Sequence, residues 1–347
     1  MEGERQTAAE KGRGVQPMIQ SISFPISAYS IAPYGGWDAL AAEIRALGCD
    51  GVEGIVDPED LDRSFPPELL SGYHMVFYPD WLDFYHRNTP ELLRKFGSRE
   101  MIERVYRGTE PEDLMKQFKD DLAFALSMHT PYVVFHVSDV SLEEGYTYRW
   151  LHTDREVLDG AVEFINELLR DVEPTCDFLV ENQWWPGFTF TDPGETEYLL
   201  SRIRYPRTGI MLDTGHLMNT RPSLRTQREG IGYILEQFRA HGELGQRVLG
   251  MHFHQSLSGA YVRKNTGRLP ADFPADYFEA FVREYPHIQS IDRHRPWTDP
   301  DCVRLLDEIR PEYLTHELSS GPRRSQLSAV RRQLRTIRQG RAGGEQG

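Results

Sequence analysis

Eight short apolar runs alternate along the chain with longer segments of helical periodicity, and this alternation limits the folds open to it. The runs are Ile19–Ile26, Gly51–Ile55, Gly72–Phe77, Tyr132–His136, Phe178–Glu181, Thr208–Leu212, Val248–His254 and Tyr313–Leu318. Between them lie the helical patterns Gly36–Leu47, Glu112–Met128, Asp154–Leu169, Thr196–Ile203, Ser223–Ala240, Ala275–Glu284 and Pro300–Ile309. Eight alternating units favour a parallel sheet closed on itself, because closure removes both sheet edges. We predict an α/β fold, a (β/α)8 TIM barrel, over an open doubly wound sheet, since no GxGxxG follows the first run.

The length of 347 residues suits one such barrel of about 250 residues with insertions. We expect a disordered polar tail over residues 1–17, the barrel over 18–322, and a basic helix with a tail over 323–347. Two long connections, 77–109 after the third run and 255–299 after the seventh, are predicted to cover the active site.

Composition limits the kinds of molecule that this chain is expected to bind and the compartment in which it is expected to work. The formal net charge of −14 argues against a nucleic-acid substrate and favours a small molecule. No apolar run reaches the length of about 18 residues that a membrane helix needs. The three cysteines form no CxxC pair, which fits a reducing, cytoplasmic setting. A homo-oligomer remains open.

Polar residues end several of the apolar runs. They are His74, His136, Glu181, Asp213, His252, His254 and Glu317. In a barrel the carboxyl ends of all strands face one mouth, so these side chains should converge. Clustered carboxylates are expensive to bury without a cation, and His with Asp or Glu is an ordinary ligand set. The sequence therefore predicts a divalent metal ion, with Mn²⁺, Zn²⁺, Mg²⁺ and Co²⁺ all compatible.

The motif Asp213-Thr-Gly-His216 is the sharpest local pattern. Asp213 leaves the strand, Gly215 lets the chain turn, and His216 returns toward the same mouth. Two ligand types three residues apart can then approach one ion.

The motifs FLVENQ, GIMLDTGH, MHFHQS and YLTHEL resemble the xylose-isomerase-like barrel superfamily, over roughly Met18–Leu318. That superfamily includes sugar and sugar phosphate isomerases and epimerases, some dehydratases, and the abasic-site endonucleases of the endonuclease IV type. The epimerase resemblance implies one ion on Glu181, Asp213, His252 and Glu317. It also places His216 near the substrate and Glu53 of DGVEG in the pocket. His254 rivals His252, which is preferred because FHQS follows it.

The endonuclease resemblance implies three zinc ions on nine ligands. The additional ligands then match His74, His136, His216 and the pair Asp292 and His294, although about forty residues separate that pair from His252. His254 stays a further candidate for metal or substrate. Trp81, Trp184 and Trp185 are candidate pocket aromatics, since sugars and bases stack on such rings.

Two enzyme classes follow from these residues. The first is a metal-dependent isomerase or epimerase of a small sugar, polyol or sugar phosphate. It would abstract a proton next to a carbonyl, with Glu181 and Glu317 as acid and base and His216 beside the substrate. Which glutamate is the base stays open. The alternative is an endonuclease IV-like multi-zinc phosphoesterase, and a non-catalytic binding barrel is a third hypothesis.

Overall fold

The eight strands close into a parallel barrel in the order β1 to β8, with β8 pairing back onto β1. The computed structural model describes residues 17–56, 59–319 and 323–344, so most of the tail expected over 1–17 and the last three residues of the segment 323–347 lie outside it. The strands are β1 Ile19–Pro25, β2 Gly51–Ile55, β3 Leu70–His74, β4 Tyr132–His136, β5 Asp177–Glu181, β6 Thr208–Asp213, β7 Val248–His252 and β8 Tyr313–His316. The predicted (β/α)8 barrel is confirmed.

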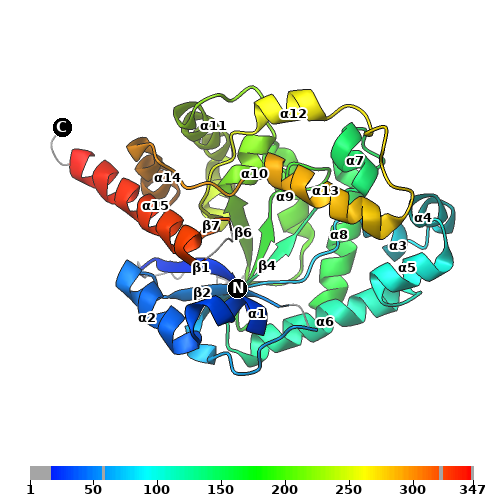
Figure 1. The fold of residues 1–347 in the computed structure, drawn as a ribbon, viewed down its shortest axis with the longest axis horizontal. Helices are drawn as coiled ribbons and strands as arrows, with labels where there is room; N and C mark the ends of the chain where they lie inside the picture. The colour runs from blue at the N-terminus through cyan, green and yellow to red at the C-terminus, as the bar shows by residue number, and fades with distance from the viewer. Residues whose placement is uncertain (1–16, 57–58, 320–322, 345–347) are drawn as a thin grey trace, which may run out of the picture.

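Helices surround the barrel, as Figure 1 shows. The outer helices that follow the strands are α2 Trp37–Leu47, α6 Pro111–Ser127, α8 Asp154–Leu168, α9 Pro193–Arg202, α11 Gln227–Ala240, α14 Val303–Ile309 and α15 Arg323–Gly344. Capping boxes start α8 at Thr153 and α11 at Thr226. The helix α15 packs its buried Leu327, Val330 and Ile337 inward. The described part of the chain contains no helix long and apolar enough to cross a membrane.

Shorter elements lie in the connections. They are α1 Ala28–Ile31, α3 Leu82–Tyr85, α4 Thr89–Phe96, α5 Arg99–Tyr106, α7 Leu142–Thr147, α10 Thr214–Asn219, α12 Gly259–Asn265 and α13 Tyr277–Ile291, with 3-10 turns η1 Ala32–Tyr34, η2 Pro67–Leu69, η3 Gly242–Arg247 and η4 Pro300–Cys302. The two long connections are thus largely helical. The sequence pattern for α13 was too short by seven residues at its end, because Pro286 inside the helix does not stop it.

Three strands end two or more residues earlier than the sequence predicts. β3 stops at His74, and β7 and β8 stop at His252 and His316, so His254 and Glu317 lie in the loops beyond. After β7 the hydroxyl of Thr214 bonds the carbonyl oxygens of both His252 and His254, which turns the chain toward α10. Although His254 and Glu317 lie in loops, their side chains remain at the mouth, beside Asp213 and His252.

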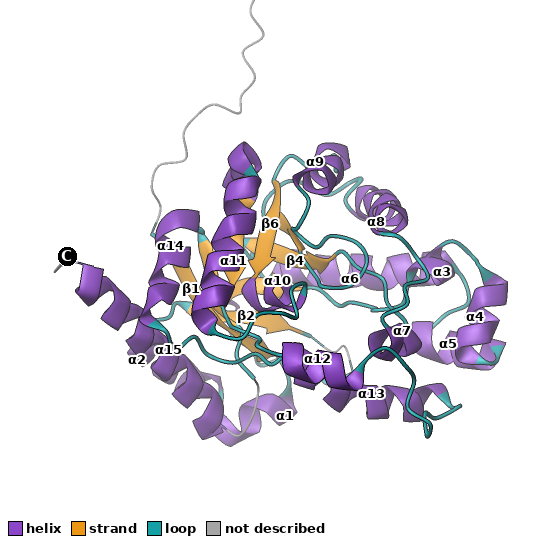
Figure 2. Cartoon of the chain, turned by 90° about the horizontal axis from the view of Figure 1, so that it is seen from above, coloured by secondary structure: helices purple, strands orange, loops and turns teal. Residues whose placement is uncertain are grey.

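The connection after β7 leaves the barrel and returns to it. Gln255 and Arg295 exchange two backbone hydrogen bonds of 2.8 and 3.1 Å, which close the excursion at its base. Within it, α13 contacts α12 and α7, and Figure 2 shows α12 and α13 beside each other along one side of the barrel. Ser319 N donates to His294 O at 3.0 Å, so the returning chain is also tied to the end of β8. This connection therefore begins and ends at the mouth of the barrel.

Candidate metal centre

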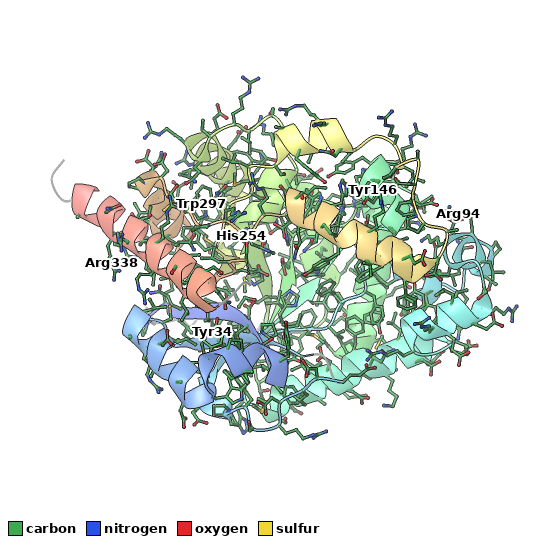
Figure 3. The ribbon with its side chains drawn as sticks, in the orientation of Figure 1. Tyr34, Arg94, Tyr146, His254, Trp297 and Arg338 are labelled. Atoms are coloured by element: carbon green, nitrogen blue, oxygen red, sulfur yellow. The ribbon has the colours of Figure 1, made fainter. Side chains whose placement is uncertain are left out.

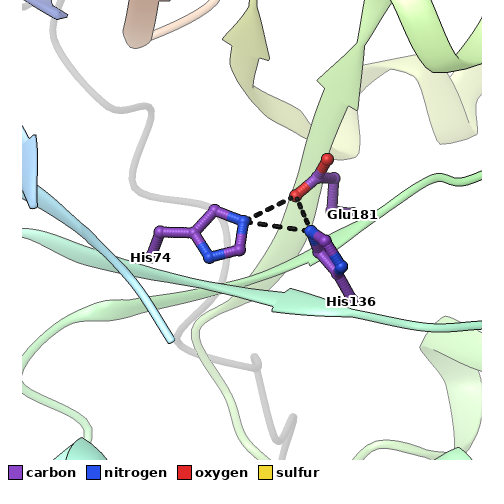
Figure 4. A group of neighbouring side chains, drawn as sticks. All are labelled: His74, His136 and Glu181. Atoms are coloured by element: carbon purple, nitrogen blue, oxygen red, sulfur yellow. Dashed lines mark hydrogen bonds and ion pairs between the residues drawn. The ribbon is translucent and has the colours of Figure 1, made fainter. Parts of the chain in front are cut away.

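Three strand-end side chains form a first group. His74 ends β3, His136 ends β4 and Glu181 ends β5. Glu181 Oε2 lies 3.3 Å from His74 Nε2 and 3.1 Å from His136 Nε2, and the two nitrogens are 3.0 Å apart (Figure 4). Three ligand-type atoms this close to one another could hold one cation.

A second group shares Glu181 and lies deeper. His252 Nδ1 is 3.5 Å from Glu181 Oε1, 3.6 Å from Asp213 Oδ2 and 3.0 Å from Glu317 Oε2. Glu181, Asp213 and His252 are at most 1% exposed, whereas Glu317 is at the rim with its side chain 19% exposed. The four residues predicted as the ligand set of one ion therefore meet.

A third group joins residues far apart in sequence. Asp292 Oδ2 lies 3.3 Å from His216 Nε2 and 3.0 Å from His294 Nε2. Asp292 follows the last residue of α13, and Ser256 Oγ donates to the neighbouring Ile291 carbonyl, which fixes the end of that helix. The forty-residue excursion thus returns Asp292 and His294 to the mouth.

Backbone carbonyls set the orientation of two histidines. His74 Nδ1 lies 2.9 Å from Met75 O, and His216 Nδ1 lies 3.0 Å from Asn182 O. A carbonyl oxygen only accepts, so each Nδ1 carries the proton and each Nε2 lone pair faces its group. Outer contacts of this kind are the usual support of a metal-binding histidine.

Glu53 supports His252 from below. Its Oε1 lies 2.9 Å from His252 Nε2, while its Oε2 accepts hydrogen bonds from Tyr132 Oη at 2.6 Å and Thr315 Oγ1 at 2.8 Å. Ser21 Oγ lies 2.9 Å from the Thr315 hydroxyl and extends the network. At 1% exposure, Glu53 lies behind the second group, under His252, rather than on an open pocket wall.

His254 occupies the space between the second and third groups. Its Nε2 lies 2.9 Å from Asp213 Oδ2 and 4.0 Å from Glu317 Oε2, and its ring centroid is 4.3 Å from that of His294. A Cβ at Gly215 would overlap the His254 ring at Cε1, so only glycine leaves room for this ring. Figure 3 shows His254 near the middle of the molecule.

The buried carboxylates and imidazoles of the cluster fit a bound cation. Burial would raise the pKa of Glu181, but the imidazoles of His136 and His252 hold the pKa of this carboxyl well below its usual value. Several buried oxygen and nitrogen atoms that could bind a metal have no hydrogen-bond partner. They include Glu181 Oε2, Glu317 Oε2, His252 Nδ1, Asp292 Oδ1 and His294 Nε2. Buried polar atoms normally find partners, so these residues fit one or more divalent ions.

The three tryptophans predicted to line the pocket lie in two different places. Trp184 and Trp185 form a tilted pair with centroids 4.1 Å apart, and Trp184 lies 5.0 Å from His216. Trp81 instead packs its ring on Phe164 of α8 and donates Nε1–H to Ser138 O. The side chain of Trp81 therefore packs in the core between α3 and α8. Trp81 lies seven residues beyond the end of β3, so the strand does not direct its side chain to the mouth.

The chain belongs to the family of xylose isomerase-like TIM barrels, whose family model matches residues 41–338. Among solved structures it is similar to L-ribulose 3-epimerase, with a TM-score of 0.51, 11% identity and coverage of 94% of this chain and 97% of that one. D-allulose 3-epimerase from Methylomonas sp. gives a TM-score of 0.50 at 13% identity over 93% of this chain and 99% of that one. Endonuclease IV from Thermus thermophilus gives 0.46 at 15% identity over 94% of this chain and 100% of that one. Comparison with curated proteins finds no match.

Two features of the centre went beyond sequence reasoning. Glu53 was placed in the pocket, whereas its carboxylate contacts His252 and two hydroxyl groups beneath the ligands. The position of His254 between two groups was also not foreseen, although the pair of histidines at alternate positions in MHFHQ signals that both face inward.

Proposed function

We propose that this protein is a divalent-metal-dependent phosphoesterase with three neighbouring metal subsites. The observation that carries the proposal is the group of His216, Asp292 and His294 beside the two groups that share Glu181. A proton-transfer enzyme that uses one ion on Glu181, Asp213, His252 and Glu317 has no need of two further ligand groups. Clustered divalent ions are typical of phosphoester hydrolysis, where the reacting phosphate carries several negative oxygens.

The residues divide among the subsites without conflict. His74 and His136 would hold one ion with Glu181 Oε2, while Glu181 Oε1 faces the second group, so this carboxylate would serve both subsites. When bound, such ions generate a nucleophilic hydroxide near neutral pH and neutralise the phosphate oxygens.

The open side of the centre is defined by exposure. The side chains of Glu317 and His294 are 19% and 29% exposed, whereas those of Asp213 and His252 are not exposed. Substrate therefore approaches over Glu317 and His294 and over His136, whose side chain is 16% exposed. Trp184, whose ring lies beside His216, would limit water on the neighbouring side and supply a flat apolar surface.

The isomerase or epimerase remains the second candidate. It is favoured by Glu181 and Glu317, which come from the ends of β5 and β8 and both face His252 Nδ1, at 3.5 and 3.0 Å. Two carboxylates that approach one ligand from different strands would suit removal of a proton from a sugar by one and its return by the other. In this reading His216 and His294 would contact substrate.

Metal stoichiometry separates the two candidates. We expect purified protein to bind about three Zn²⁺ per chain and the Asp292→Ala, His294→Ala double variant to lose one of them, because those residues make up most of one group. Arg295→Ala is the matched control, since its exposed side chain lies in the same segment. We expect hydrolysis of bis(p-nitrophenyl) phosphate by the wild type. One tightly bound ion per chain, with epimerisation of a ketose and no hydrolysis, would establish the second candidate instead.

A further inference from the structure

His254 is the one histidine of the cluster that the three ligand groups above do not use. It is fully buried, yet its Nε2 points to Asp213 Oδ2 and Glu317 Oε2, at 2.9 and 4.0 Å, rather than into apolar surroundings. The Cε1 edge of the ring packs on the backbone at Gly215, and Nδ1 is buried without a hydrogen-bond partner. Of its two nitrogens, Nε2 is the one that faces the carboxylates of the centre.

His254, His294 and Glu317 together form a fourth group of donor atoms within 4.8 Å of one another. His294 Nε2 and Glu317 Oε2 are buried atoms without a partner of hydrogen-bond geometry. His294 is also a member of the third group, where its Nε2 lies 3.0 Å from Asp292 Oδ2. One imidazole nitrogen holds one ion, so the third and fourth groups cannot be filled together.

We propose that His254 gives the centre a second position for its third ion, held by His254, His294 and Glu317 in place of His216, Asp292 and His294. The donor set of two imidazoles and one carboxylate suits Zn²⁺ or Co²⁺ better than Mg²⁺. His294 is the shared ligand, so an ion moves between the two positions without leaving the protein. The proposal rests on the proposed three-ion centre and extends it.

A purely structural role for His254 predicts a different number of bound ions in the His216→Ala variant. If His254 only donates a hydrogen bond to Asp213, the His216→Ala variant should lose the third ion completely. If His254 is a ligand, the third ion should persist in His216→Ala, bound more weakly, at the position between His254, His294 and Glu317.

The experiment compares three proteins loaded with Co²⁺. Bound metal is counted by elemental analysis after equilibrium dialysis, and ion positions are found by anomalous scattering from crystals. We expect about three ions in the wild type and in His216→Ala, with the third ion displaced toward His254 in the variant, and about two ions in His216→Ala, His254→Gln. Glutamine can still donate a hydrogen bond to Asp213, which keeps that contact.

Gly215→Ala in the His216→Ala background gives a second route. Its Cβ displaces the His254 ring without removing any donor, so the third ion should again be lost while melting temperature reports that the barrel remains folded. Two ions in His216→Ala, or a third ion that survives the His254→Gln exchange, overturns this proposal and leaves the three-ion centre intact. A single ion in the wild type overturns the centre itself.

Discussion

Glu53→Gln changes the charge beneath His252 and keeps the shape of the side chain. In the native protein the carboxylate oxygen at 2.9 Å favours a proton on His252 Nε2, so that the Nδ1 lone pair faces Glu181, Asp213 and Glu317. In the variant the amide oxygen can still accept from Tyr132 and Thr315, which turns the amide NH2 toward Nε2. That arrangement favours the opposite tautomer, with the proton on the nitrogen that should bind metal.

The size of the effect follows from what such outer contacts contribute elsewhere. Removing the partner of a ligating histidine typically costs about 10–100-fold in metal affinity, which corresponds to about 1.4–2.7 kcal/mol. Burial favours the upper part of this range, because Glu53 and His252 are 1% and 0% exposed and water cannot replace the lost charge. The loss should be confined to the ion on the second group.

A competitive chelator titration with Zn²⁺ measures this change, and Tyr132→Phe is the control. That variant removes the 2.6 Å hydrogen bond to Glu53 Oε2 but keeps the carboxylate charge, so its metal affinity should fall less than that of Glu53→Gln. Wild-type zinc affinity in Glu53→Gln, or equal losses in the two variants, would refute the argument that the charge on Glu53 orients His252.

Three further outcomes follow from the structure. Lys95→Met should lower the free energy of unfolding, measured in urea, by about 3–5 kcal/mol. Lys95 Nζ lies 2.7 Å from both Asp80 and Asp83 in a buried site, and the variant leaves these carboxylates without their cation. An unchanged free energy of unfolding contradicts this prediction. Burial raises the pKa of Glu284 from 4.5 to about 8, so the folded chain keeps a proton that the unfolded chain releases, and stability falls as pH rises between these values. Glu284→Gln should therefore melt higher than wild type at pH about 8 and like wild type at pH about 4.5; equal shifts at both pH values contradict the assignment. Asp213→Asn should lower bound Zn²⁺ while circular dichroism stays native, because Asp213 Oδ2 lies 3.6 Å from His252 Nδ1; full zinc occupancy refutes its ligand role.

The residues that sequence reasoning located best are those at strand ends. His136 and Glu181 occupy the last positions of β4 and β5, and their side chains meet because all strands of a parallel barrel end at one mouth. Asp292 was harder to place, since its return depends on how far α13 extends and on its packing against α7. Glu53 depended on the register between neighbouring strands, which decides the layer of the barrel interior that a side chain occupies.

The paired backbones of Gln255 and Arg295 fix where the long connection after β7 leaves the barrel and where it returns. The segment between them leaves the barrel and returns to the same point, and Ser256 Oγ bonds the Ile291 carbonyl and the Arg293 N–H, so that Asp292 comes back beside His216. Closing a longer loop costs little additional entropy, about 0.6 kcal/mol for each doubling of its length. A change in length within this segment should therefore leave the ligand geometry intact as long as the Gln255–Arg295 pair, the contacts of Ser256 and the packing of α13 on α7 are kept.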